Sequence, residues 1–253
     1  MKAIILAGGR GIRLSEITES TPKPLVEINQ IPIIEHVIRH LNKYGFKDFY
    51  LLLGYKANLI KKYFLDYKIL KTNFSIDYKS NKIQKLNKVD INFKINLIET
   101  GLNSNTGGRL SYLKDILNKN EEFFLTYCDA ITDLNIKEFL KAHKKNKIQN
   151  SLVLSRLTAR FGKMRLNEKN FLVKEFFEKN PDLENFVNAG YYILNSNIIK
   201  LIDNLDCNFE NEILPVLAKN NNLSFFKHYG FWQPMDNIRD KQLLENYFKN
   251  ELL

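Results

Sequence analysis

The feature that most constrains the fold is an apolar run that leads directly into glycines. Residues 2–7 have the sequence KAIILA, and Gly8, Gly9 and Gly11 follow at once. An uninterrupted apolar run of this length is typical of a strand buried on both faces of a parallel sheet. Glycines after such a strand let the backbone approach a phosphate chain, although a lone glycine-rich turn is as typical of a tight strand-to-helix connection. The sequence therefore predicts a first buried strand that ends in a candidate phosphate-binding loop.

Up to residue 157 the chain alternates between strand-like and helix-like segments. In the segment 33–44, for example, apolar residues recur at helical spacing, and Gly45 closes the predicted helix. The predicted helices are 33–44, 57–64, 108–117 and 136–143, and the predicted strands are 2–7, 49–53, 93–99, 123–127 and 151–157, with a polar insertion of loop and short strands at 66–92. Short connections between alternating elements imply an α/β fold with a Rossmann-like, doubly wound and mostly parallel sheet.

Beyond residue 157 the rhythm changes. The predicted elements are the strands 163–166, 172–177, 187–194 and 223–227, the helices 197–203 and 211–219, and a closing helix at 238–252. The longer connections predict a smaller, mixed antiparallel lobe that receives a second substrate. We therefore expect one domain, residues 1–253, with lobes of about 1–157 and about 158–253.

Composition and charge exclude several classes of protein. The 253 residues are 44% hydrophobic, carry a net charge of +10 and include two cysteines. No uncharged apolar run reaches the length of a bilayer-spanning helix, and the apolar start is too short for a signal peptide. We expect neither a disordered chain nor a disulfide framework, and we expect a cytoplasmic protein. The charge admits an anionic partner, either a nucleotide or RNA, but the spread of the basic residues favours a solvated surface.

Two acids and two cations complete the candidate chemistry. Asp129 follows the predicted strand 123–127, and the carboxyl edge of an open α/β sheet is where a carboxylate can hold Mg²⁺. Asp236 ends the string YGFWQPMD before the closing helix. Each acid alone also fits a helix cap, but as a pair they fit a two-carboxylate metal site. Arg13 and Lys23 lie shortly after the glycines and are candidate phosphate ligands.

Together these motifs resemble the nucleotidyltransferase family of nucleotide-sugar synthesis, and within it the glucose-1-phosphate cytidylyltransferases. The resemblance covers essentially all 253 residues. The strings AGGRGIRL from Ala7 and PKP around Lys23 mark the wider family, whereas TGGR at 106–109 and GFWQPMD ending at Asp236 point to the cytidylyl branch.

The resemblance implies an enzyme with a GT-A-like nucleotidyltransferase fold that requires Mg²⁺. An oxygen of the acceptor phosphate, most simply that of α-D-glucose 1-phosphate, would attack the α-phosphorus of CTP, and CDP-glucose and pyrophosphate would result. Such chemistry needs alignment of two anions and neutralisation of the developing charge. Its partners would be small molecules, with neither nucleic acid nor membrane, and a homo-oligomer is expected from the resemblance alone.

The resemblance also assigns roles to residues. Arg13 and Lys23 would be catalytic, with Arg13 on the β- and γ-phosphates and Lys23 on the α-phosphate. Asp129 and Asp236 would hold Mg²⁺. The other implied nucleotide contacts are Leu6, Ala7, Gly8, Gly9, Gly11, Thr106, Gly107, Gly108 and Arg109, and the implied acceptor contacts are Lys179 and Asn188.

Several positions depart from the family's pattern. They are Ile12 in the glycine loop, Cys128 and Ala130 beside the metal acid, Leu102 in place of an acid, and Asn180 and Ala189 in the acceptor motifs. Since these changes fall near the sugar and acceptor positions, a CTP-dependent enzyme for another sugar phosphate or a non-sugar phosphate stays open. A non-catalytic nucleotide sensor or RNA-binding module is the more remote alternative, because the charged residues of catalysis are retained.

Overall fold

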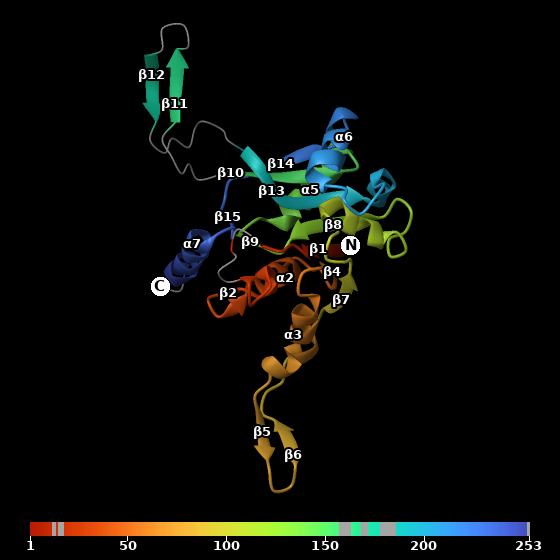
Figure 1. The fold of residues 1–253 in the computed structure, drawn as a ribbon, viewed down its shortest axis with the longest axis vertical. Coiled ribbons are helices and arrows are strands. Elements are labelled where there is room, and N and C mark those ends of the chain that lie inside the picture. Colours follow the sequence, from red (N-terminus) through yellow and green to blue (C-terminus); the bar gives the residue numbers. More distant parts are fainter. Residues whose placement is uncertain (12–13, 15–17, 157–162, 168–171, 178–185, 252–253) are drawn as a thin grey trace.

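The computed structural model describes residues 1–11, 14, 18–156, 163–167, 172–177 and 186–251. Its centre is a sheet of seven strands in the order β14-β10-β13-β8-β1-β4-β7 (Figure 1). The strands are β1 (Lys2–Ala7), β4 (Asp48–Leu53), β7 (Lys94–Glu99), β8 (Glu122–Tyr127), β10 (Ser151–Arg156), β13 (Phe186–Asn195) and β14 (Ser224–His228). Only β13 runs antiparallel to its neighbours in this sheet, which confirms the predicted α/β fold with a mostly parallel sheet.

Two strands from the second part of the sequence belong to this central sheet. β13 lies between β8 and β10, and β14 forms an edge next to β10. From Ala189 onward β13 is buried throughout, as a strand in the middle of a covered sheet must be. The other two predicted strands, β11 (Lys163–Asn167) and β12 (Leu172–Phe177), pair only with each other.

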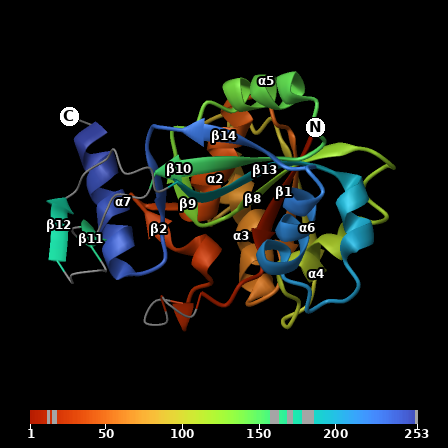
Figure 2. The same cartoon turned by 90° about the horizontal axis from the view of Figure 1, so that it is seen from above.

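Helices cover both faces of the sheet. Figure 2 shows α5 on one side of the strands and α4 and α6 on the other. The first face carries α2 (Ile33–Lys43), α3 (Ala57–Leu70) and α5 (Ile136–Asn146), and the second carries α4 (Thr106–Leu110), the 3-10 turns Ser111–Leu113 and Ser196–Leu201, the π-helical turn Phe209–Ile213 and α6 (Leu214–Lys219). Alternate residues of each strand supply the two cores, with Ile5 and Phe124 on the first face and Ile4 and Leu125 on the second.

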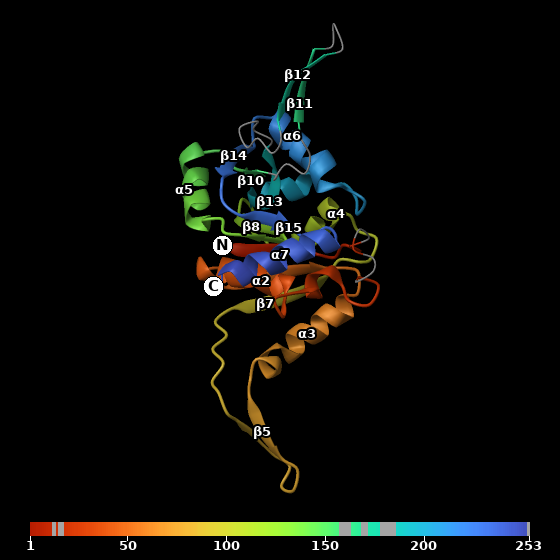
Figure 3. The same ribbon diagram turned by 90° about the vertical axis from the view of Figure 1, so that its left-hand side faces the viewer.

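Two hairpins project from opposite ends of the molecule (Figures 1 and 3). One is formed by β11 and β12. The other, formed by β5 (Phe74–Asp77) and β6 (Lys82–Lys85), follows α3, and every residue of its two strands is exposed. The predicted insertion of loop and short strands is therefore present, but α3 runs on to Leu70 before the insertion begins.

Short ladders and the last helix flank the carboxyl edge of the sheet. β2 (Glu27–Ile28) pairs with β3 (Ile31–Pro32), β9 (Ala130–Thr132) pairs with β15 (Trp232–Pro234), and α7 (Ile238–Glu251) follows. A third apolar cluster, which includes Val26, Ile131, Met235 and Leu244, joins these pieces. Among the described helices, none combines the length and the apolar character that crossing a bilayer requires.

Candidate active site

The glycine-rich loop, residues 8–11, leaves β1 as predicted and packs closely on two basic side chains. Gly11 adopts a φ of +63°, in the left-handed region that favours glycine. A Cβ atom at Gly8 would lie 2.4 Å from the guanidinium of Arg109, and one at Gly11 would lie 3.2 Å from the Cβ of Lys23. The absence of side chains therefore lets Arg109 and Lys23 come close to the loop backbone.

Arg109 is buried, with 5% of its surface exposed, and its donors point to oxygens of the protein. The guanidinium donates hydrogen bonds to the hydroxyl of Thr100 and to three backbone carbonyls: those of Leu53 at 3.2 Å, Gly101 at 2.9 Å and Gly8 at 3.0 Å. These bonds tie the ends of β1 and β4 to the segment after β7. In this arrangement Arg109 positions the floor of the site.

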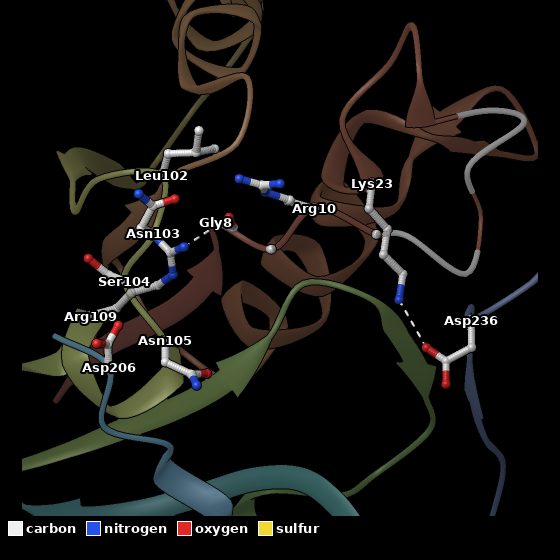
Figure 4. A pocket seen from close by; sticks show the side chains of 12 residues that line it. Gly8, Arg10, Lys23, Leu102, Asn103, Ser104, Asn105, Arg109, Asp206 and Asp236 are labelled. Carbon is white, nitrogen blue, oxygen red and sulfur yellow. Dashed lines mark hydrogen bonds and ion pairs between the residues drawn. The ribbon is translucent and has the colours of Figure 1, made fainter.

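Lys23 joins the two predicted metal acids. Its Nζ atom donates to Oδ2 of Asp129 at 2.6 Å and to Oδ1 of Asp236 at 3.1 Å, and Figure 4 shows the second bond. Burial alone would lower the pKa of Lys23, but the charges and hydrogen bonds of Asp129 and then of Asp236 raise it above its ordinary value of 10.5. Lys23 is therefore a fixed cation at neutral pH, and three residues predicted from separate motifs meet in space.

The ladder between β9 and β15 brings the two acids together. Asp129 directly precedes β9, and Asp236 follows β15 after Met235. Pro234 pairs with Ala130, and the backbone N–H of Met235 donates to the carbonyl of Asp129 at 2.8 Å. Since Met235 is fully buried, this short ladder is anchored in the third apolar cluster.

Two adjoining cavities, of about 520 and 240 Å³, open beside this group. Both are lined by the glycine-rich loop, Lys23 and Arg109; Asp236 and Asp206 line the larger, and Asp129 and Tyr127 the smaller. In Figure 4, Lys23 and Asp236 lie on one side of the larger cavity, and Asn103, Asn105 and Asp206 on the other. The cavities lie at the carboxyl edge of the sheet, where α/β folds bind their ligands.

Most predicted site residues line these cavities, and some do not. The residues that line them are Leu6, Gly8, Gly9, Gly11, Lys23, Thr106, Arg109, Asp129 and Asp236. Ala7 is buried in the core of the first face. Asn188 lies on β13, where its Nδ2 donates to the hydroxyl of Tyr192 at 2.6 Å and its Oδ1 accepts from the N–H of Gly190 at 3.0 Å. Arg13, Lys179 and the departures Ile12 and Asn180 lie outside the described residues.

The glycines of the TGGR motif pack against protein. Gly107 and Gly108 face a loop that follows β13, and a Cβ atom at Gly108 would lie 2.0 Å from the carbonyl oxygen of Leu205. The neighbouring Thr106 donates its hydroxyl to Glu210 at 2.8 Å and accepts from the N–H of Phe209 at 3.0 Å. These residues therefore join α4 to the turn before α6.

Sequence reasoning missed several residues that line the cavities. They are Arg10, Asn103, Ser104, Asn105, Tyr127 and Asp206. The polar string 103–105, directly before TGGR, was a local signal that could have been used. No local sequence signal marked Asp206, because only the fold brings its loop to the site. Cys128 beside the metal acid is buried, which raises the pKa of its thiol and keeps it protonated.

The donor set fits a magnesium ion that is shared with phosphates. Mg²⁺ prefers one or two carboxylates together with water and substrate oxygens. Within the described part of the chain, His, Cys, Asp and Glu side chains form no cluster of three that could hold a metal ion. Among the described side chains, Asp129 and Asp236 could therefore hold Mg²⁺ together with oxygens from substrate and water, as in phosphoryl-transfer sites.

Comparison with known proteins yields a family and close relatives. Residues 2–235 match the family model described as Nucleotidyl transferase. Glucose-1-phosphate cytidylyltransferase of Salmonella typhimurium strain LT2 is 38% identical over 249 residues, 98% of this chain and 96% of that protein. A probable glucose-1-phosphate cytidylyltransferase of Bacillus subtilis is 35% identical over 247 residues, 97% and 94% of the two chains.

Solved structures show the same fold. HddC from Yersinia pseudotuberculosis, in complex with GMP-PN, superposes with a TM-score of 0.69 at 22% identity, covering 98% of this chain and 99% of that one.

Proposed function

The chain belongs to the nucleotidyl transferase family and is an enzyme of nucleotidyl transfer to a sugar phosphate, and from this premise we propose that it uses CTP, Mg²⁺ and α-D-glucose 1-phosphate. The products would be CDP-glucose and pyrophosphate. The names of the two relatives support the choice of nucleotide and acceptor.

The observation that carries this proposal is the bonding of Lys23 to both Asp129 and Asp236 beside the glycine-rich loop. A cation fixed between two carboxylates, next to a cavity of about 520 Å³, suits a polyphosphate that brings its own metal ion. Arg10, which lines the same cavity, adds a further described cation to Lys23 and Arg109.

In the proposed reaction an oxygen of the acceptor phosphate forms a bond to the α-phosphorus of CTP. The bond between that phosphorus and the bridging oxygen breaks, and pyrophosphate leaves with the electron pair. Lys23 orients the α-phosphate and neutralises charge that develops there, and positioning together with neutralisation supplies most of the catalysis in such transfers. Asp129 and Asp236 would hold Mg²⁺, which supplies further neutralisation when it is bound.

The departures near the acid act on packing more than on charge. Cys128, Ala130 and Ala189 are buried, and the carbonyl of Ala189 accepts from the indole N–H of Trp232 at 3.0 Å. Of the three, Cys128 alone lines a described cavity, the smaller one. A different sugar phosphate is the second candidate for the acceptor, because the resemblance places these departures near the sugar and the acceptor.

The test is release of pyrophosphate by the purified protein with four nucleotides and a set of phosphate esters. We expect the highest turnover with CTP and α-D-glucose 1-phosphate, and loss of turnover when EDTA removes Mg²⁺. Turnover with CTP and another ester alone would select the second acceptor. No turnover with any CTP combination, or equal turnover with dTTP, would contradict the proposal.

We also propose that copies of the chain assemble through the β5–β6 hairpin. An isolated two-stranded hairpin is marginally stable in water and needs packing on another surface. Here Tyr78 is 82% exposed and Ile83 69% exposed, and every residue of the two hairpin strands is exposed. A partner that stabilises the hairpin must be present wherever the protein folds, and a second copy meets that condition.

A further inference from the structure

The loop of residues 204–208, here termed the Asp206 loop, is docked on the first turn of α4. The carbonyl of Leu205 accepts from the backbone N–H of Asn105 at 2.8 Å, and the carbonyl of Cys207 accepts from that of Gly108 at 3.0 Å. Two backbone hydrogen bonds therefore fix the loop beside the segment that lines the larger cavity.

Two glycines make this docking possible. A Cβ atom at Gly108 would lie 2.0 Å from the carbonyl oxygen of Leu205, and one at Gly107 would lie 2.8 Å from the Sγ of Cys207. Real Cβ atoms do not approach other atoms so closely, so any side chain at Gly108 would displace the loop. The glycine pair of TGGR thus serves to bring the Asp206 loop to the cavity.

Asp206 is the charged residue that this docking delivers. It lines the larger cavity together with Asn103 and Asn105, and Figure 4 shows the three on the same side. Its backbone N–H donates to Oδ1 of Asn204 at 2.8 Å, a turn that fixes the backbone. In the part of the chain that the structure describes, no hydrogen bond or ion pair engages its carboxylate.

A carboxylate is unexpected in a cavity for a polyphosphate, because like charges repel. The electrostatic repulsion is small only if the phosphates lie at the end of the cavity that is far from Asp206. Lys23 and Asp236 lie across the cavity from Asp206 in Figure 4, at the end where the proposed Mg²⁺ and the phosphates would meet. Phosphates would lie towards Lys23, and the base of the nucleotide would lie towards Asp206.

We propose that Asp206 accepts a hydrogen bond from the exocyclic amino group of the base and thereby selects cytosine over uracil and thymine. This inference rests on the proposed function, in which the larger cavity takes a nucleoside triphosphate. Cytosine presents an N–H donor at the position where uracil and thymine present a carbonyl oxygen. A carboxylate bonds the donor and repels the oxygen, and a hydrogen bond to a charged group discriminates by about tenfold or more.

The test compares nucleotide binding by the wild type, Asp206→Asn and Asp206→Ala, measured by titration calorimetry with CTP, UTP and dTTP in the presence of Mg²⁺. We expect the preference for CTP over UTP to fall about tenfold in Asp206→Asn, because its amide can donate to the carbonyl oxygen of uracil. Asp206→Ala should weaken binding of CTP and remove the repulsion of UTP, but should bind UTP less tightly than Asp206→Asn does, because alanine has no amide to donate to uracil. Asp203→Asn is the matched control, since Asp203 is an exposed acid that lies just before the same loop but does not line the cavity.

Binding and turnover separate this inference from the proposed function. If the wild type binds CTP selectively but turns over no acceptor, the proposed function fails and the base preference is still measured. An unchanged preference in Asp206→Asn, an equal change in Asp203→Asn, or a wild type that binds no nucleotide would each overturn the assignment of Asp206.

Discussion

At the scale of single residues, the site depends on the charge balance around Lys23. One ammonium group faces two carboxylates at 2.6 and 3.1 Å, so the group as a whole keeps one negative charge. In the proposed function, that residual charge is what Mg²⁺ would neutralise, and the phosphates would take over part of the contact with Lys23. The two ion pairs therefore hold Lys23, Asp129 and Asp236 in fixed positions relative to one another.

Replacing Asp129 by Asn tests this balance. We expect turnover to fall by about a hundredfold or more, because the closest carboxylate of the group and one proposed ligand of Mg²⁺ are lost. The fold should persist, since Lys23 keeps its bond to Asp236. Pyrophosphate release and thermal unfolding followed by circular dichroism provide the two measurements.

Asp133→Asn is the control for that variant. Asp133 is half exposed and contacts His228 at 3.0 Å, without lining either cavity. Its replacement should leave turnover close to that of the wild type. Near-normal activity in Asp129→Asn would contradict the metal assignment.

The sequence predicted which charged residues would meet better than it predicted the residues that hold them in place. Lys23, Asp129 and Asp236 stood out because each follows a motif with a chemical reason, and the structure brings them together. The structural roles of Arg109 and Gly108 could not be predicted from local sequence patterns. The partners of these residues are backbone carbonyls of Gly8 and Leu205, which lie about a hundred positions away in the chain.

At the scale of elements, strong periodicity predicted long elements well and short ones poorly. The helices α2 and α5 begin where the sequence predicted them. The predicted helix at 108–117 is instead the five-residue α4, Thr106–Leu110, followed by a 3-10 turn. The three-residue strands β9 and β15 were missed, since each is too short for a pattern and exists only through its pairing with the other.

Gly108→Ala tests the docking of α4 on the Asp206 loop. The added methyl group would collide with the backbone of Leu205, so we expect the free energy of unfolding to fall by about 2–3 kcal/mol. Gly9→Ala is the matched control for stability, because no heavy atom lies within 4 Å of a Cβ at Gly9. Urea unfolding of the two variants measures the difference, and equal stability would contradict this role for Gly108.

The connection between α2 and α3 depends on a buried acid. Glu35 on α2 is 1% exposed and accepts from the hydroxyl of Tyr63 on α3, from Arg39 and, at 3.1 Å, from Lys71. Burial alone would raise the pKa of Glu35, but the hydrogen bonds from Tyr63 and Lys71 and the nearby charges lower it below 4.5. Because the pKa of Glu35 is lowered on folding, the ionised carboxylate stabilises the folded protein fully above pH 4.5. This stabilisation is lost as the pH falls through the lowered pKa.

Glu35→Gln should therefore destabilise the protein by about 2 kcal/mol at neutral pH. The difference from the wild type should shrink below pH 4.5, where the wild-type carboxyl becomes protonated. Urea unfolding of the wild type and Glu35→Gln at a series of pH values from 7 to 3 measures the difference in their free energy of unfolding. Glu99→Gln, which removes the exposed pair with Lys61, should have almost no effect at any pH. If the free energy of unfolding of Glu35→Gln differed from that of the wild type by the same amount at every pH, the Glu35 carboxylate would not be the ionised, hydrogen-bonded group described here.

At the scale of the whole molecule, the β5–β6 hairpin predicts the state of assembly. Ile76 and Ile83 pair across its strands and are both exposed. We expect light scattering after size-exclusion chromatography to show an oligomer for the wild type and a smaller mass for the double variant Ile76→Thr and Ile83→Thr, because apolar contact area is lost.

Val216→Thr is the control for this experiment, since it replaces an exposed apolar residue of α6, away from the hairpin. Its mass should match that of the wild type. A monomeric wild type at micromolar concentration, or the same mass for the double variant, would contradict assembly through the hairpin.

The ladder between β9 and β15 also makes Asp236 separable from the central sheet. The seven strands of that sheet end at His228, whereas β15 and then Asp236 follow later in the chain. A chain cut off before residue 232 would therefore still contain every strand of the sheet but would lack one of the two proposed ligands of Mg²⁺. Folding of the sheet and completion of the site are thus assigned to different segments of the sequence.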